Sequence, residues 1–187
     1  MKYVSVDIKT TGLDPCSCHI LEMGVIIEDT EKQLDRDQCP TFHCYVDREI
    51  YGGSLFALDM NATVLHEILG MKKNPPSPLL LKEERIVAKF LYFLRSNNIH
   101  RPIFAGKNFA GFDLQFLKML PGWEAIKYRH RTLDPTFALV DWDHDTIPPD
   151  TAECKRRAGL PAIVSHRALD DAWDIIQLTR IIAKEKL

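Results

Sequence analysis

VDIKTTGLDP, residues 6–15, places an acidic residue at the end of an apolar run and follows it with a Thr-Thr-Gly turn. The neighbours Val4, Val6 and Ile8 predict a buried strand around Asp7. An acidic side chain at the end of such a strand is typical of a metal site. Lys9 lies two residues further on and on the same side of an extended chain, so a positive charge stands where metal binding would favour a negative one.

The composition predicts one globular domain over residues 1–187. The chain is 45% apolar and 27% charged with a net charge of −2, which excludes the disordered and fibrous classes. With so little net charge, any nucleic-acid binding must use local patches of charge. No apolar stretch is long enough to cross a membrane, and the N-terminus leads directly into a strand, which a signal peptide does not. We therefore expect no membrane partner and a cytoplasmic location.

Local patterns predict mixed strands and helices. Strands are expected over 3–8, 20–28, 41–46 and 102–105, and helices over about 61–69, 82–96, from near Phe109, and over 167–184. The segment 47–60 is expected to be a Gly-containing loop. Asp134, before Pro135, and Asp150 are predicted helix N-caps, and Gly159 with Pro161 is expected to end the second of these helices.

Three carboxylates fall on core-facing positions of three different elements. Besides Asp7, Asp113 lies within the apolar stripe of its predicted helix, and Asp171 lines up with apolar residues of the last helix, whereas Asp170 and Asp174 are expected on a wetter face. An unpaired buried carboxylate is costly, so such groups are usually paired or bind a metal ion. Oxygen ligands favour Mg²⁺ or Mn²⁺.

The cysteines predict free thiols better than a metal site. Two groups could be considered for zinc: Cys16, Cys18 and His19, and Cys39, His43 and Cys44. A Cys-x-Cys spacing is not the usual arrangement for zinc ligands. The odd count of five also argues against a complete disulfide framework.

Three motifs carry a family resemblance. VDIKTTGLDP resembles the D-x-E-T-T-G-L-x-P opening of the DEDDh 3′–5′ exonucleases, NFAGFDLQFL (108–117) their N-x-x-x-F-D-x-x-F-L motif, and SHRALDDA (165–172) their H-x-A-x-x-D-A motif. The motifs occur in the family's order and frame most of the chain. Residues 116–139 also resemble oligoribonucleases, which belong to this family with ribonuclease T and polymerase proofreading subunits.

The resemblance implies a fold, a reaction and a set of catalytic groups. The fold would be ribonuclease H-like α/β, with a central mixed five-stranded sheet flanked by helices. The whole chain would be one exonuclease domain that removes 5′-mononucleotides from 3′ ends with two divalent ions, Mg²⁺ or Mn²⁺. Asp7, Asp113 and Asp171 would bind the metal ions, and His166 would be the general base.

The resemblance also implies substrate contacts. Thr10, Thr11, Leu13 and Asn108 would bind the end of single-stranded DNA or RNA. Two basic stretches, Lys127–Arg131 and Lys155-Arg156-Arg157, are candidate phosphate patches, although a solvated charged face explains them equally well. The resemblance to oligoribonucleases favours short RNA as the substrate and a homodimer as the assembly.

Lys9 departs from the family at a ligand position, where the family has Glu. Because one unit pair at about 4 Å and a dielectric of about 20 is worth roughly 4 kcal/mol, this two-unit change beside a divalent ion approaches roughly 16 kcal/mol before relaxation. Either the ammonium turns to solvent, or that metal is lost, or Lys9 neutralises the carboxylates. Glu22 and Asp14 are nearby in sequence as substitute ligands.

Three accounts of Lys9 remain open. It could be an introduced or accidental substitution, the mark of a natural relative that binds 3′ ends without cutting them, or part of a working but rearranged site. We expect impaired catalysis on the charge argument. The alternative function is a catalytically inactive nucleic-acid-binding or scaffold protein on the exonuclease fold.

Overall fold

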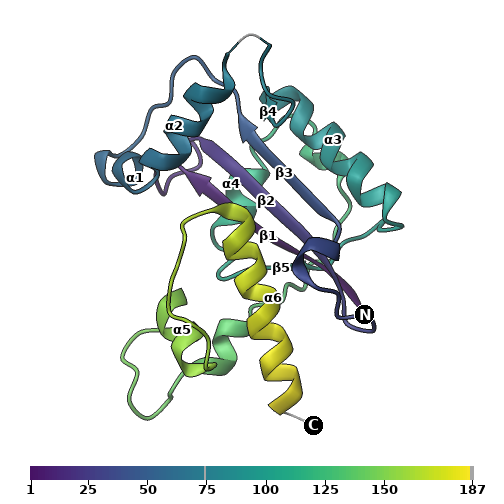
Figure 1. Cartoon of the computed structure of the whole chain (residues 1–187), viewed down its shortest axis with the longest axis vertical. Coiled ribbons are helices and arrows are strands. Elements are labelled where there is room, and N and C mark those ends of the chain that lie inside the picture. Colours follow the sequence, from purple (N-terminus) through teal and green to yellow (C-terminus); the bar gives the residue numbers. More distant parts are fainter. Residues whose placement is uncertain (74, 186–187) are drawn as a thin grey trace.

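The fold is built on a five-stranded mixed sheet in the order β4-β3-β2-β1-β5 (Figure 1). The structure, a computed structural model, describes residues 1–73 and 75–185. The central strands β1, β2 and β3 are antiparallel, whereas β5 pairs parallel with β1 and β4 parallel with β3. The strands are β1 Lys2–Thr10, β2 Ile20–Asp29, β3 Thr41–Val46, β4 Leu80–Leu81 and β5 Phe104–Ala105. The predicted mixed five-stranded sheet is confirmed.

In the part of the chain that the structure describes, six α-helices accompany this sheet. They are α1 Leu55–Met60, α2 Ala62–Met71, α3 Glu83–Ser96, α4 Asp113–Leu117, α5 Thr151–Arg157 and α6 Ala168–Glu185. Short 3-10 turns lie at Arg36–Gln38, Trp123–Ala125 and Pro135–Leu139. Among the described residues, no helix has the length and apolar character needed to cross a membrane.

Most predicted elements are present, and the differences have local causes. α1 forms inside the segment predicted as a loop, because Ser54 caps it by accepting a hydrogen bond from the Ala57 amide at 3.2 Å. α4 begins at Asp113 and not near Phe109, because turns occupy the preceding residues. The predicted caps are confirmed: Asp134 accepts from the Thr136 amide and Asp150 from the Glu153 amide, although the first of these caps a 3-10 turn.

The two faces of β1 have different partners. Val4, Val6 and Ile8 point into the larger core cluster, which includes the buried residues of α3 and α4. The alternate residues face α6, which lies across the sheet (Figure 1). On that face the Ser5 hydroxyl donates to the Ala172 carbonyl at 2.7 Å. Asp7 and Lys9 continue this row, because alternate side chains of a strand point to the same face. Both therefore point toward the N-terminal part of α6.

A glycine allows α6 to approach the sheet closely. Gly24 of β2 lies opposite Asp7 of β1 and under the first turn of α6. A Cβ at this position would lie under 3.0 Å from backbone atoms of Ala168 and Leu169. The contact therefore requires glycine, and it sets how near Asp171 comes to the end of β1.

Candidate active site

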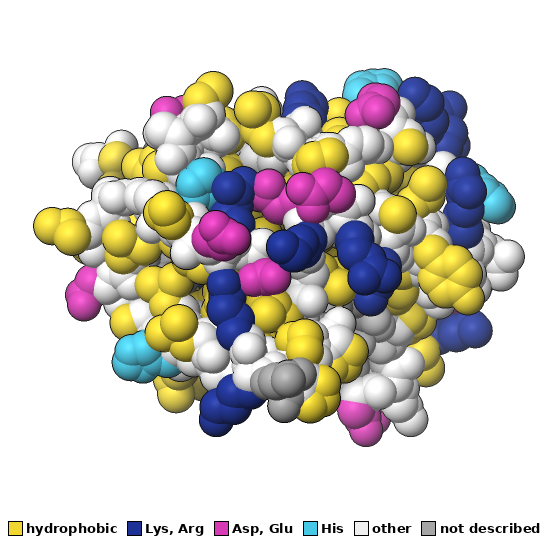
Figure 2. Space-filling view, turned by 90° about the horizontal axis from the view of Figure 1, so that it is seen from above, with side chains coloured by type: hydrophobic (Ala, Val, Ile, Leu, Met, Phe, Trp, Pro, Cys, Tyr) yellow, Lys and Arg dark blue, Asp and Glu magenta, His cyan; other side chains and the backbone are white. Residues whose placement is uncertain are grey.

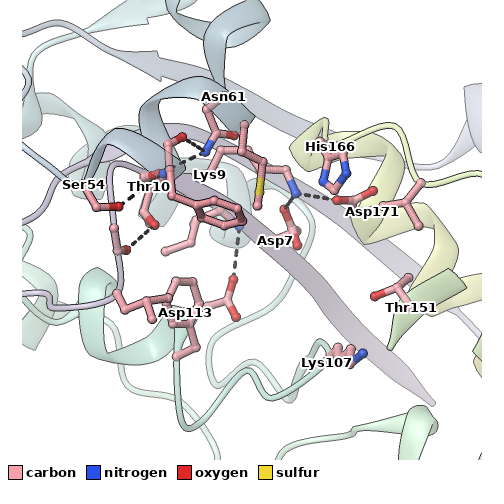
Figure 3. A pocket seen from close by; sticks show the side chains of 18 residues that line it. Asp7, Lys9, Thr10, Ser54, Asn61, Lys107, Asp113, Thr151, His166 and Asp171 are labelled. Carbon is pink, nitrogen blue, oxygen red and sulfur yellow. Dashed lines mark hydrogen bonds and ion pairs between the residues drawn. The ribbon is translucent and has the colours of Figure 1, made fainter. Parts of the chain in front are cut away.

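A pocket of about 390 Å³ lies at the C-terminal end of β1, between α1, α4 and the start of α6. It brings together most of the residues singled out from the sequence (Figure 3). Its lining includes Asp7, Lys9, Thr10, Leu13, Asp113, His166 and Asp171. The three predicted carboxylates thus reach one cavity from β1, α4 and α6.

Lys9 lies between two of these carboxylates. Its Nζ is 2.9 Å from Oδ2 of Asp7 and is also ion-paired with Oδ2 of Asp171 (Figure 3). The Lys9 and Asp171 side chains are only 11% and 12% exposed. Of the outcomes considered for Lys9, the structure has the ammonium neutralising the carboxylates and not turned to solvent.

Burial dominates the ionisation of this cluster. It raises the pKa of Asp7 to about 7 against the opposing charge of Lys9, and the charge of Asp171 adds to the rise. Burial alone would lower the pKa of Lys9, but Asp7 and Asp171 raise it above its ordinary value. The pKa of Asp113 is raised well above its ordinary range, first by burial and then by the charge of Asp7.

Asp113 joins the second motif to β1. It is the first residue of α4 and is buried, and its Oδ1 accepts a hydrogen bond from the Ile8 amide at 3.1 Å. This bond fixes the carboxylate beside the strand that carries Asp7 and Lys9. The position of Asp113 therefore depends on contact between α4 and β1 as well as on the apolar stripe.

His166 enters the pocket from the loop before α6. Its backbone is left-handed, with φ 56°, and its ring lies beside Asp171 and the end of Lys9 (Figure 3). The following residues hold this loop in place. Arg167 is ion-paired with Glu67 and donates to the Tyr45 hydroxyl at 2.6 Å, and the Ala168 amide donates to Glu22 at 3.1 Å.

The residues predicted to bind substrate divide into two groups. Leu13 is 84% exposed and lines the pocket, and Thr10 also lines it although its hydroxyl donates to the Gly12 carbonyl. Thr11 and Asn108 are not among the lining residues. The Thr11 hydroxyl donates to the Gly52 carbonyl at 2.6 Å and accepts from the His19 backbone amide at 2.8 Å, so it stabilises the turn. The backbone amide of Asn108 donates to the Asp134 carboxylate at 2.9 Å.

Sequence reasoning missed a further set of lining residues. They are Ser54, Phe56, Ala57, Met60 and Asn61 from the α1 region, together with Lys107, Phe112, Thr151 and Val164. Phe56 and Met60 are four residues apart on one side of α1 and are 74% and 46% exposed, so an amphipathic reading of α1 would have found them. Lys107 immediately precedes the second motif, and its Nζ donates to the Pro149 carbonyl at 2.9 Å.

Neither substitute ligand considered for position 9 takes part in the pocket. Glu22 is buried but binds His43 at 2.8 Å and the Ala168 amide at the start of α6. Asp14 is exposed and stabilises its own turn by accepting from the Cys16 amide and the Ser17 hydroxyl. The missing carboxylate at position 9 is therefore not supplied by these side chains.

The stretch Lys155-Arg156-Arg157 is not a free phosphate patch. Lys155 is buried and its Nζ lies 2.7 Å from Asp174, so the prediction of a wetter face for Asp174 is wrong. Arg156 pairs with Glu153, and Arg157 pairs with Asp145 and Glu153. The pairs with Asp174 and Asp145 join α5 to its neighbours, whereas the pairs with Glu153 lie within α5. The partners outside α5 are distant in sequence, so the local pattern did not indicate them.

The second basic stretch lies away from the pocket. Arg129, His130 and Arg131 line a separate hollow with Met1 and Arg101, at the opposite end of β1. On the face seen in Figure 2, basic and acidic side chains are interspersed. Ion pairs such as Arg48–Glu83 and Lys72–Asp47 engage further basic side chains outside the pocket. Phosphate binding at the pocket would therefore rely on its own few charges.

The donor set does not fit a divalent ion between Asp7 and Asp171. In the described part of the chain two carboxylate oxygens, Oδ1 of Asp171 and Oδ2 of Asp7, are buried without a hydrogen-bond partner, although Oδ2 of Asp7 is ion-paired with Lys9. A divalent ion between the two carboxylates would nevertheless meet the Lys9 ammonium. Within residues 1–73 and 75–185, no three His, Cys, Asp or Glu side chains gather to hold a metal ion. The five cysteines are free thiols.

Comparison with known proteins identifies the fold. No protein-family model and no curated protein sequence matches the chain. Among solved structures, it is similar to a zinc-bound complex of E. coli exonuclease I with single-stranded DNA and to a complex of the same enzyme with a dA16 oligonucleotide, both at a TM-score of 0.67 and 12% identity. The apo form of exonuclease I matches at a TM-score of 0.65 and 13% identity.

The chain is covered almost fully, but the solved proteins are longer. Each match covers 98% of the chain, which spans only 40 to 42% of the exonuclease I chains. At this level of identity the likeness shows the fold alone. The ribonuclease H-like fold implied by the three motifs is thus confirmed.

Proposed function

We propose that the pocket binds the 3′ end of single-stranded nucleic acid on the fold of a 3′–5′ exonuclease, and that Lys9 impairs hydrolysis by the chain as written. One observation carries the proposal: the Lys9 ammonium is paired with Asp7 and Asp171 in a cavity that also holds Asp113 and His166. Support for the ligand comes from the exonuclease I structures of the same fold, which are in complex with single-stranded DNA.

The pocket walls suit a terminal nucleotide. Leu13, Phe56 and Met60 present exposed apolar surface on one side of the cavity. A base can stack on the ring of Phe56 and pack against Leu13 and Met60 with little sequence preference. Lys107 provides a positive charge for a phosphate. This combination favours recognition of a strand end over recognition of a base sequence.

The catalytic part of the proposal concerns a proton and a charge. Hydrolysis would add water across the last phosphodiester bond and release a 5′-monophosphate. We expect His166, which lies beside Asp171, to take the proton of that water. Position 9 supplies a positive charge where the family's motif has a carboxylate, so we expect little or no cleavage.

The first experiment measures whether binding depends on a 3′ end. Fluorescence anisotropy would follow a 5′-labelled oligonucleotide, with unlabelled linear and circular single strands of one sequence as competitors. We expect the linear strand to compete and the circular strand to compete far less. Equal competition would contradict end recognition.

A variant pair tests whether the pocket is the binding site. Leu13→Ala should weaken binding by about 1–2 kcal/mol, because a base packed against this leucine buries apolar groups at about 0.8 kcal/mol per CH₂. The matched control is Leu69→Ala: Leu69 is 65% exposed on α2 but does not line the pocket. Equal effects of the two variants would place the nucleic acid elsewhere.

A further inference from the structure

We infer that Lys9 is the resident cation of this pocket: it joins Asp7 to Asp171, so that neither the fold nor the binding of a 3′ end requires a divalent metal ion. The statement about binding rests on the proposed function, whereas the statement about the fold does not. Both follow from where the ammonium lies and from what surrounds it.

The ammonium connects two elements of the fold. Lys9 is on β1 and its ammonium pairs with Asp171 on α6. The same ammonium also pairs with Asp7, which is on β1 as well. A lysine ammonium is a compact charge with three donors. The Lys9 ammonium donates a hydrogen bond to Asp171 and is ion-paired with Asp7. Because this cation is covalently attached, it cannot be removed by a chelator or diluted away.

The surrounding contacts set the distance that Lys9 spans. Gly24 lets α6 lie against the sheet, and Ser5 fixes α6 one turn further along through the Ala172 carbonyl. Glu22 accepts from the first amide of α6. These contacts hold Asp171 within reach of the Lys9 ammonium without any additional ion.

A second cation is disfavoured at the same place. A divalent ion between Asp7 and Asp171 would have to displace a charge of the same sign from a largely buried position. Lys9 and Lys107 both line the pocket, and each retains donor capacity beyond the contacts described above. With two such phosphate contacts to a single strand, the logarithm of the affinity should fall against the logarithm of salt concentration with a slope of about −1.4.

Thermal unfolding tests the statement about the fold. The melting temperature of the unmodified chain should be the same in EDTA and in Mg²⁺ or Mn²⁺ at matched ionic strength. Lys9→Met should lower it in EDTA by on the order of 10 °C, because two partly buried carboxylates lose the cation between them, and divalent ions should restore part of the loss. If the unmodified chain gained as much from divalent ions as Lys9→Met, the inference would be overturned.

Lys155→Met is the matched control. Lys155 and Asp174 form a second buried Lys–Asp pair, 2.7 Å apart and each 9% exposed. Its removal should also lower the melting temperature, but divalent ions should not restore it. Restoration in both variants would show a general effect of the ions and would overturn the assignment. Lys9→Glu adds a further carboxylate between Asp7 and Asp171, so its melting temperature should depend on divalent ions more strongly than that of Lys9→Met.

Oligonucleotide binding tests the second statement. The affinity of the unmodified chain for a linear single strand should change by less than about twofold between EDTA and Mg²⁺ at matched ionic strength. Binding that is lost only in EDTA, with an unchanged melting temperature, would overturn metal-independent binding but leave the role of Lys9 in the fold. Absence of binding in both conditions would instead refute the proposed function on which this half rests.

Discussion

Gly24→Ala should disturb the site although residue 24 carries no functional group. The added methyl group would lie under 3.0 Å from the backbone of Ala168 and Leu169, at the start of α6. Since backbone atoms cannot rotate away as a side-chain end can, α6 or β2 must move. The displaced helix carries Asp171, and the loop before it carries His166.

The expected size of the effect follows from these contacts. Overpacking of this kind costs about 1–3 kcal/mol. Strain on the hydrogen bonds from the Ala168 amide to Glu22 and from Ser5 to the Ala172 carbonyl adds about 0.5–1.5 kcal/mol for each bond lost. We therefore expect Gly24→Ala to lower the free energy of unfolding by about 3 kcal/mol and to weaken binding of a 3′ end.

Urea denaturation followed by circular dichroism measures the stability, and anisotropy measures the binding. Gly70→Ala is the matched control: Gly70 lies in α2, and a Cβ there would meet nothing within 4 Å. It should stabilise the protein by about 0.5–1 kcal/mol, because alanine favours the helix. If Gly24→Ala proved as harmless as this control, the close packing of α6 on β2 and its role in placing Asp171 would be refuted.

Three further predictions concern the electrostatics and the walls of the pocket. Burial raises the pKa of Asp7 from 3.8 to about 7. Between about pH 4 and pH 7 the native state therefore keeps a proton that the unfolded state has lost, so the free energy of unfolding should fall as the pH rises through this range. Carbon NMR should find the Asp7 carboxyl titrating near 7 and not near 4. Phe56→Ala should weaken oligonucleotide binding by about 1–3 kcal/mol in anisotropy while Leu69→Ala leaves it unchanged, and similar losses would argue against α1 as a pocket wall. Arg167→Met should cost about 2 kcal/mol in urea denaturation, because Glu67 and the Tyr45 hydroxyl keep only their bond to each other and lose their contacts with the residue before α6; an unchanged midpoint would contradict that anchoring role.

The side-chain directions in the site that follow from the regular repeat of a strand or a helix could be predicted from the sequence. Alternation along β1 places Asp7 and Lys9 on one side, and helical periodicity places Asp171 on the core side of α6. The motifs around Asp113 and His166 then identified the other two members of the pocket. Local spacing was sufficient here because each residue's direction is set by its own strand or helix.

The parts that depend on distant partners were not predictable. The Thr11 hydroxyl donates to the Gly52 carbonyl, 41 residues away, and Asp174 is buried against Lys155 of another helix. Neither partner leaves a signal near these residues in the sequence. The Ser54 cap did leave a signal, but the adjacent glycines favoured a loop and concealed α1.

The most direct test of the account is digestion of 5′-labelled short RNA and single-stranded DNA with Mg²⁺ or Mn²⁺. The unmodified chain, Lys9→Glu and the double variant Lys9→Glu/His166→Ala would be compared after each is shown to be folded and to bind the strand. We expect Lys9→Glu to trim from the 3′ end at a rate orders of magnitude above that of the unmodified chain, and we expect the double variant to lose this activity. Trimming by the unmodified chain at the rate of Lys9→Glu, or none by a folded Lys9→Glu that binds the strand, would contradict the claim that Lys9 disables an exonuclease site.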